Sequence, residues 1–325
     1  MSMFRTVVNP TPLQDKISHT SKIMMIGSCF TDNIGAKLKQ SKFSADINPF
    51  GIQYNPVSVK NSLELLMNRK IFRKEDLDFC NERWFSFYHH SEFSDSGQKK
   101  CLEKINDRIQ SASDLLEKAD YLFLTFGTAR VYRLPGKDMV VSNCHKLPEK
   151  EFERQLLAPR EIESCYNGLI NKLTLFNPGV KIVFTVSPVR HWKDTPEGNQ
   201  VSKSTLILAI HGLVNRFDNA AYFPAYEIMM DDLRDYRFYK QDMLHPNETA
   251  IEYLWEKFAQ TYFSEDTRHI IREVEKINKA LRHQPFNPES GEYATFLKSL
   301  SAKMVDLQKK YPFLNLREEM REFQK

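Results

Sequence analysis

Short apolar runs alternate with longer amphipathic stretches through the first 260 residues of the chain. Strands buried in a sheet are expected to be short and apolar. The runs that predict such strands are 22–26, 43–47, 121–126, 181–186 and 221–224. The intervening stretches long enough for crossover helices are 57–68, 98–118, 151–176 and 202–217. This alternation predicts an α/β fold, with a five-stranded, mostly parallel sheet covered by helices on both faces.

The loops that follow these strands carry most of the residues with chemical potential. In an open parallel sheet, ligands bind beyond the carboxyl ends of the strands. We therefore expect one site to form where these five loops meet. In strand order, the loops contribute Ser28, then Asn48 and Gly51, then Gly127 and Thr128, then Arg190 and His191, and finally Asp242 and His245.

Two insertions and a helical tail complete the organisation. The segments 71–97 and 130–148 interrupt the alternation and are interpreted as hairpins that wall the site. We divide the chain into an α/β domain, 1–263, and a helical C-terminal extension, 264–325. The extension is interpreted as a cap or as a hairpin that joins two copies into a homodimer. After Asn247 the expected helices are 248–263, 265–283 and 290–310.

A serine and a histidine far apart in sequence suggest nucleophilic chemistry. Asp242 lies three residues before His245, so its carboxylate can orient the histidine through one ring nitrogen. The other nitrogen is then free to take a proton from a serine. Ser28 lies between a predicted strand and a predicted helix over 32–40, where backbone N–H groups at the helix start can hold an oxyanion.

Composition excludes several other classes of function. The chain has 325 residues and a net charge of only +4, which gives no reason to expect nucleic acid or an anionic membrane as partner. No apolar run is long enough to span a bilayer, and the first 15 residues lack the apolar core of a signal peptide, so we expect a cytoplasmic protein. Five scattered cysteines argue against a disulfide framework or a zinc site, and no glycine-rich phosphate loop is present. We expect no metal and no cofactor.

A set of short motifs resembles a known family. The chain resembles the SGNH/GDSL hydrolases and, more closely, the GSCFA family. The resemblance covers roughly residues 20 to 250 and implies a three-layer α/β/α fold with Ser–His–Asp chemistry. The motifs that carry it are Gly27-Ser28-Cys29-Phe30, 48–52 with 54–56, 126–129, 143–146, 187–191, and 231–239 leading into Asp242 and His245.

The resemblance also implies roles for individual residues. Ser28 would be the nucleophile, His245 the general base and Asp242 its orienting partner. The oxyanion-hole glycine of the SGNH hydrolases could correspond to Gly51. Their asparagine after the third strand is missing, because this loop has Gly127 and Thr128, so the Thr128 hydroxyl is the natural replacement.

Several neighbouring residues have both a functional and an ordinary interpretation. Cys29 is a rival nucleophile, although its side chain is expected to point into the helix packing. Asn48 and His145 are candidate substrate-binding residues, and His145 could equally be held by backbone hydrogen bonds. Arg190 could bind a substrate carboxylate or phosphate, or pair with an acidic neighbour. The aromatic residues between 84 and 88 could stack on a sugar or belong to the core.

Three functions remain consistent with these residues. The first is a metal-independent serine esterase that acts on a small acyl ester, such as an O-acetyl group on carbohydrate. An acyltransferase would use the same triad with an alcohol in place of water. A third alternative is a catalytically degenerate protein that binds a glycan or a protein partner, and the missing asparagine favours that alternative.

Overall fold

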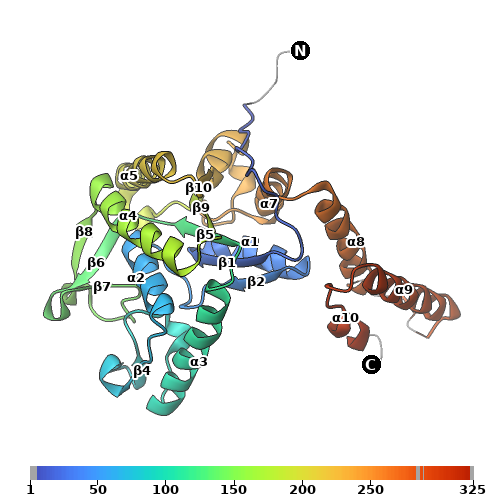
Figure 1. The fold of residues 1–325 in the computed structure, drawn as a ribbon, viewed down its shortest axis with the longest axis horizontal. Helices are drawn as coiled ribbons and strands as arrows, with labels where there is room; N and C mark the ends of the chain where they lie inside the picture. Colours follow the sequence, from blue (N-terminus) through green and yellow to red (C-terminus); the bar gives the residue numbers. More distant parts are fainter. Residues whose placement is uncertain (1–5, 283–285, 288, 323–325) are drawn as a thin grey trace.

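A five-stranded parallel sheet forms the centre of the molecule (Figure 1). The computed structural model describes residues 6–282, 286–287 and 289–322. The strand order is β10-β9-β5-β1-β2, and every pair is parallel. Each predicted strand is confirmed to within one residue. Their bounds are β1 Lys22–Gly27, β2 Ser44–Ile47, β5 Tyr121–Phe126, β9 Lys181–Val186 and β10 Ala220–Phe223.

Helices cover both faces of the sheet, which gives the three expected layers. Successive residues of a strand point to opposite faces. Met24 and Ile26 of β1 therefore pack in one core cluster, and Ile23 and Met25 pack in the other. The first cluster is covered by α2 Pro56–Met67, α3 Gln98–Leu116, α4 Pro159–Phe176 and α5 Thr195–Arg216. The second is covered by α1 Cys29–Gln40 and α7 Glu248–Tyr262, with the short α6 Ala225–Glu227 beside them.

One predicted helix is wrong in its first third. The stretch 151–176 was expected to be helical throughout, but Glu153–Leu156 forms strand β8 and α4 begins at Pro159. Proline favours the first position of a helix because its missing N–H has no partner there anyway. The Glu161 carboxylate also accepts the Ala158 N–H and so fixes this helix start. Strand β8 pairs with β6 Arg130–Leu134, which also pairs with β7 Met139–Val141.

Both insertions contain hairpins, as predicted. The first is formed by β3 Asp78–Cys80 and β4 Arg83–Phe85, and the second by β6 and β7. Phe85 and Phe87 are buried together with Val141 and Phe152, so these aromatic residues join the two insertions to each other. The core interpretation therefore holds for Phe85 and Phe87.

The C-terminal helices lie to one side of the sheet domain (Figure 1). They are α8 Glu265–Leu281, α9 Gly291–Lys310 and α10 Arg317–Glu322, of which α10 was not predicted. The predicted end of α8 at residue 283 lies outside the described residues. An apolar cluster of their own, including Val274, Leu300 and Met304, holds these helices together. In the described part of the chain, no helix is long and apolar enough to cross a membrane.

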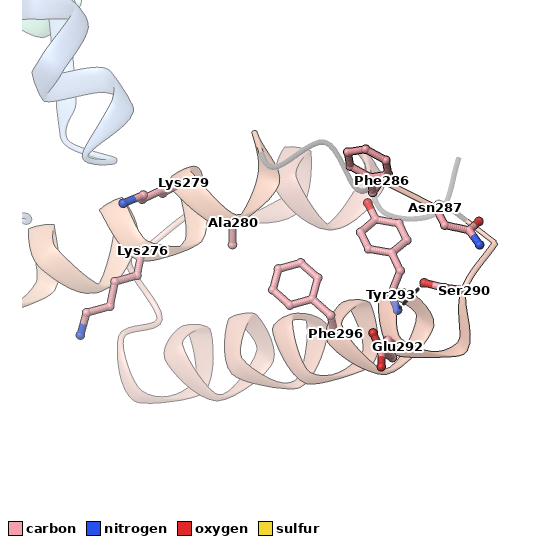
Figure 2. Close-up of a pocket in the computed structure, with 9 residues that line it drawn as sticks. All are labelled: Lys276, Lys279, Ala280, Phe286, Asn287, Ser290, Glu292, Tyr293 and Phe296. Carbon is pink, nitrogen blue, oxygen red and sulfur yellow. Dashed lines mark hydrogen bonds between the residues drawn. The ribbon is translucent and has the colours of Figure 1, made fainter.

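A pocket of about 680 Å³ lies between α8 and α9. Figure 2 shows the rings of Tyr293 and Phe296 pointing from α9 toward α8. All residues that line this pocket fall within 276–296, outside the sheet domain. It therefore has no connection with the loops at the strand ends.

Candidate functional site

A pocket of about 300 Å³ opens at the carboxyl edge of the sheet, where the strand order predicts a site. Its lining comes from the loops after β1, β2, β5, β9 and β10 and includes Tyr54 and Trp192. The lining unites five residues that were predicted to meet at the site: Ser28, Gly127, Arg190, His191 and His245. Five others lie outside it: Asn48, Gly51, Thr128, His145 and Asp242. The two insertions, whose residues are all described, contribute nothing to this lining, so they do not wall the pocket.

Ser28 lies at the junction between β1 and α1. Its backbone is extended, and its Oγ accepts the Phe30 N–H at 3.3 Å, which makes it the N-cap of α1. The preceding Gly27 has φ +153°, and a Cβ there would lie 2.2 Å from the Thr125 carbonyl oxygen. Only glycine therefore permits β1 to run so close to β5. This close approach places Ser28 at the inner end of the pocket, where the residue is 1% exposed.

His245 and Asp242 form a hydrogen-bonded pair at the outer end of the pocket. Nδ1 of His245 lies 2.6 Å from Asp242 Oδ2. Asp242 Oδ1 also accepts the N–H groups of Leu244 and His245, both at 2.9 Å. The two backbone hydrogen bonds, followed by that to the ring, lower the pKa of Asp242 to about 2. A proton on Nδ1 would be held by the carboxylate, which leaves Nε2 as the acceptor.

Within the described residues, no hydrogen bond joins Ser28 to His245. The His245 side chain is 44% exposed, whereas Ser28 is buried. The loop that carries His245 includes Met243, whose backbone is in the left-handed region at φ 58°. Catalytic hydrogen bonds are often long before a substrate is bound. The geometry therefore places the two residues in one pocket without a formed proton path between them.

Arg190 links the loop after β9 to the loop that carries His245. Its guanidinium lies over the rings of Trp192 and Tyr239, at 5.2 and 5.6 Å from their centroids. Nη2 donates to the Met243 carbonyl at 3.2 Å. These contacts were not foreseen, because sequence suggested only a substrate or an acidic partner for Arg190. They hold the position of the His245 loop.

A second histidine–aspartate pair contacts the same pocket. His191 lines it, and His191 Nδ1 lies 3.4 Å from Asp194 Oδ2. The Asp194 side chain is fully buried and also forms ion pairs with Arg130 and Arg154. Burial, with help from Arg154 and other nearby cations, lowers the pKa of His191. Asp194 was missed at the sequence level, although its position three residues after a histidine was a usable signal.

Most predicted oxyanion donors are already engaged in hydrogen bonds. The N–H groups of Gly127 and Thr128 both donate to the Tyr54 carbonyl, at 2.7 and 3.0 Å. The Thr128 hydroxyl lies 3.0 Å from Ser202 Oγ and accepts the Arg130 N–H. The Ser28 N–H has a longer bond of 3.3 Å to the Thr125 carbonyl. At the start of α1, the Phe30 N–H donates to Ser28 Oγ at 3.3 Å and the Thr31 N–H donates to the Ser28 carbonyl at 2.8 Å.

Asn48 and Gly51 shape the turn at Ser28 from outside the pocket. Asn48 Oδ1 accepts the Gly27 N–H at 2.8 Å, and its Nδ2 donates to Asp32. The Gly51 N–H donates to the Asn48 carbonyl, and Gly51 has φ +75° against the His90 side chain. Both residues support the loop geometry around Ser28 in this structure.

The ordinary, non-catalytic interpretation describes His145 correctly, but the expected position of Cys29 is wrong. The His145 ring stacks on Phe85 at 4.1 Å and bonds the Ser86 carbonyl, and burial lowers its pKa to about 4. This is the backbone-held arrangement that sequence offered as the alternative. Cys29 is half-buried and lines the pocket, and so is not packed into the helix interior as expected. Burial raises the pKa of its thiol, which makes it a poor thiolate nucleophile.

Comparison with protein families decides the relationship that the motifs suggested. The model of the GSCFA family matches residues 22–258, which is more than half of the chain. The chain belongs to the GSCFA family. A second model, the C-terminal domain of GSCFA domain proteins, matches residues 274–325. Together the two models cover the central sheet and most of the C-terminal helical region of this GSCFA chain.

Three solved structures resemble this GSCFA chain at low sequence identity. Among curated proteins, none matches it. A Streptococcus pneumonia protein provisionally identified as a platelet activating factor has a TM-score of 0.38 and 11% identity, over 79% of this chain and 86% of its own. A carbohydrate esterase family 3 protein from Talaromyces cellulolyticus has a TM-score of 0.35 and 10% identity, over 79% and 99%. The acetyl xylan esterase Est2A from Butyrivibrio proteoclasticus has a TM-score of 0.35 and 8% identity, over 76% and 64%. The activity of this chain must therefore be argued from its own residues.

Proposed function

We propose that this GSCFA protein is a metal-independent serine esterase of the SGNH type. Ser28 is the nucleophile, His245 the general base and Asp242 the residue that orients it. The supporting observation is that Ser28 and His245 line one pocket while Asp242 holds His245 Nδ1 at 2.6 Å. Nucleophile, base and orienting group on separate loops of one site are the arrangement that serine hydrolysis requires.

The proposed reaction passes through an acyl-serine. The Ser28 hydroxyl gives its proton to His245 Nε2 as Oγ attacks the ester carbonyl. The tetrahedral oxyanion forms beside the start of α1, whose N–H groups stabilise negative charge. Collapse breaks the bond to the alcohol, which takes the proton from His245. Water then gives a proton to His245, attacks the acyl carbon and releases the acid, and Ser28 regains its proton.

The size of the pocket suggests a small acyl group. Its volume of about 300 Å³ is at the lower limit of ligand pockets in proteins. We infer that an acetyl or similar group enters it, with the alcohol part, for example a carbohydrate, remaining at the mouth. Transfer to another alcohol would use the same residues and would differ only in how well water is excluded.

The alternative is a glycan- or partner-binding protein that no longer catalyses. It is favoured by the absence, within the described residues, of a hydrogen bond between Ser28 and His245. The engaged N–H groups of Gly127 and Thr128 point in the same direction. An experiment that reports serine activation without needing the substrate separates the two functions.

Covalent labelling by a fluorophosphonate provides this test. An activated serine displaces fluoride from the probe, and intact-mass analysis counts the adducts. We expect one adduct on the wild type, its loss in Ser28→Ala, and its retention in Ser187→Ala. Ser187 is a matched control because it lines the same pocket but follows β9. A folded wild type that neither reacts nor hydrolyses p-nitrophenyl acetate would support the binding protein instead.

A further inference from the structure

A buried lysine lies against the peptides that line the pocket. Lys203 belongs to α5 and is 0% exposed. Its Nζ donates to the Gly127 carbonyl at 2.7 Å and to the Ser187 carbonyl at 2.8 Å. Gly127 and Ser187 follow β5 and β9, and both line the pocket. One side chain therefore ties together the ends of β5 and β9, and β5 is the neighbour of β1, which leads into Ser28.

The surroundings compensate the charge of Lys203 only in part. Among the described residues, no carboxylate forms an ion pair with it, although Glu227 and Cys29 are near enough to favour its charged form. Nζ also lies 5.6 Å from the centre of the Tyr226 ring. Burial of an ammonium group is costly without a close counter-ion, and it lowers the pKa of Lys203 to about 7.

The fold thus buries an ammonium group at a position where an apolar side chain would cost less desolvation free energy. A neutral amine or an amide could satisfy two carbonyls, so the hydrogen bonds alone do not require a positive charge. Burial raises the pKa of Cys29 and lowers that of His191, and the positive charge of Lys203 is a smaller contribution that acts to lower both. Both residues line the pocket. Negative charge develops in this region when the Ser28 adduct forms, and a fixed cation stabilises such charge in a water-poor site.

We propose that Lys203 is a positioning residue of the esterase site, which holds the Gly127 and Ser187 peptides and supplies positive potential beneath the oxyanion. This inference rests on the proposed esterase function. SGNH hydrolases use an asparagine after the third strand to stabilise the oxyanion, and this chain lacks it. The inference assigns part of that role to the buried positive charge of Lys203. Hydrolysis should then require Lys203 in its protonated form, so that the rate falls on the alkaline side of the pH profile.

The pH dependence of kcat/KM for p-nitrophenyl acetate tests this role. For the wild type we expect a decline on the alkaline side as Lys203 loses its proton. Cys29 should not cause this decline, because burial and Asp32 raise the pKa of its thiol. In Lys203→Met we expect kcat to fall about tenfold, KM to change little and the alkaline decline to disappear. The control, Lys172→Met, removes an exposed lysine that pairs with Glu64 and should leave the profile unchanged.

The outcomes separate the two proposals. An active wild type without an alkaline decline would overturn the role of Lys203 while leaving the esterase intact. A decline that persists in Lys203→Met would do the same. A wild type that neither hydrolyses esters nor reacts with fluorophosphonate would overturn both. Because the role of Lys203 requires an alkaline decline in the wild type, its absence there overturns the role even if Lys203→Met does not fold.

Discussion

Two histidine–aspartate pairs contact the same pocket, and they differ most in the exposure of their carboxylates. The Asp242 side chain is 45% exposed, and all its hydrogen bonds come from its own loop. The Asp194 side chain is 0% exposed and lies between Arg130 and Arg154. Both aspartates are three residues from their histidine. Equal spacing in sequence has therefore produced two different electrostatic environments.

The difference indicates which histidine can act as a base. A general base becomes an imidazolium during the reaction, so its surroundings must tolerate a new positive charge. Next to His191, burial comes first and Arg154 second among the causes that lower its pKa. Next to His245, the carboxylate of Asp242 has its pKa lowered to about 2 and stays ionised to balance the charge. The exposed pair therefore suits proton transfer, whereas the buried pair suits structure.

The largest expected effect is on the catalytic rate of the two histidine variants. Loss of a general base typically costs about 10²- to 10⁴-fold. We expect His245→Ala to lower kcat for p-nitrophenyl acetate by that amount, and His191→Ala to lower it less than about tenfold. Steady-state kinetics on both purified variants measures this, with circular dichroism to confirm folding. A greater loss in His191→Ala than in His245→Ala would reverse the comparison.

The second-largest expected effect is on the free energy of unfolding. Here the pair of His191 and Asp194 should matter more than the pair of His245 and Asp242. Removing one partner from a buried ion pair leaves an uncompensated charge and typically costs about 3–5 kcal/mol. We expect Asp194→Asn to lower the free energy of unfolding by about this amount, because Arg130 and Arg154 lose their common carboxylate. Urea denaturation at neutral pH measures the difference.

Asp242→Asn is the matched control for this stability measurement. Its carboxylate is exposed, so water can solvate what remains and the free energy of unfolding should change little. The same variant should lower kcat, because His245 loses the acceptor that fixes its Nδ1 proton. Equal stability losses in Asp194→Asn and Asp242→Asn would show that burial of the carboxylate does not determine how much each pair contributes to stability.

The sequence was enough for the elements with a strong local signal. The five strands are continuous apolar runs, and Ser28, Arg190 and His245 could be placed in one pocket because parallel strands end at one edge. The helix that was expected to start at 151 shows the limit of this approach. Glu153–Leu156 pairs with β6, and nothing within four residues of local sequence specifies a tertiary strand partner.

The residues that tune the site could not be predicted for a related reason. Asp194 and Lys203 are charged residues that local sequence would place in solvent. Both are buried because distant segments supply partners: Arg130 and Arg154 for the first, the Gly127 and Ser187 carbonyls for the second. Likewise, the expectation that Thr128 replaces an oxyanion donor did not foresee Ser202 opposite its hydroxyl. Such pairings follow from the tertiary fold and have no counterpart in local patterns.

The smallest expected effect is a change in the titration of His191, which probes the electrostatic cause of the comparison directly. An unperturbed histidine titrates at about 6.5. NMR of the imidazole protons should give His191 a lower pKa in the wild type, and Arg154→Met should raise it. The substitution removes a repelling cation and also leaves Asp194 less neutralised, and both changes favour the imidazolium. A histidine whose pKa is lowered on folding contributes stability that is present above about 6.5 and is lost as pH falls from there through the lower pKa of the folded state. Arg154→Met should therefore lessen the acid sensitivity attributable to His191, whereas a wild-type pKa at or above 6.5 would remove the reason for excluding His191 as the base.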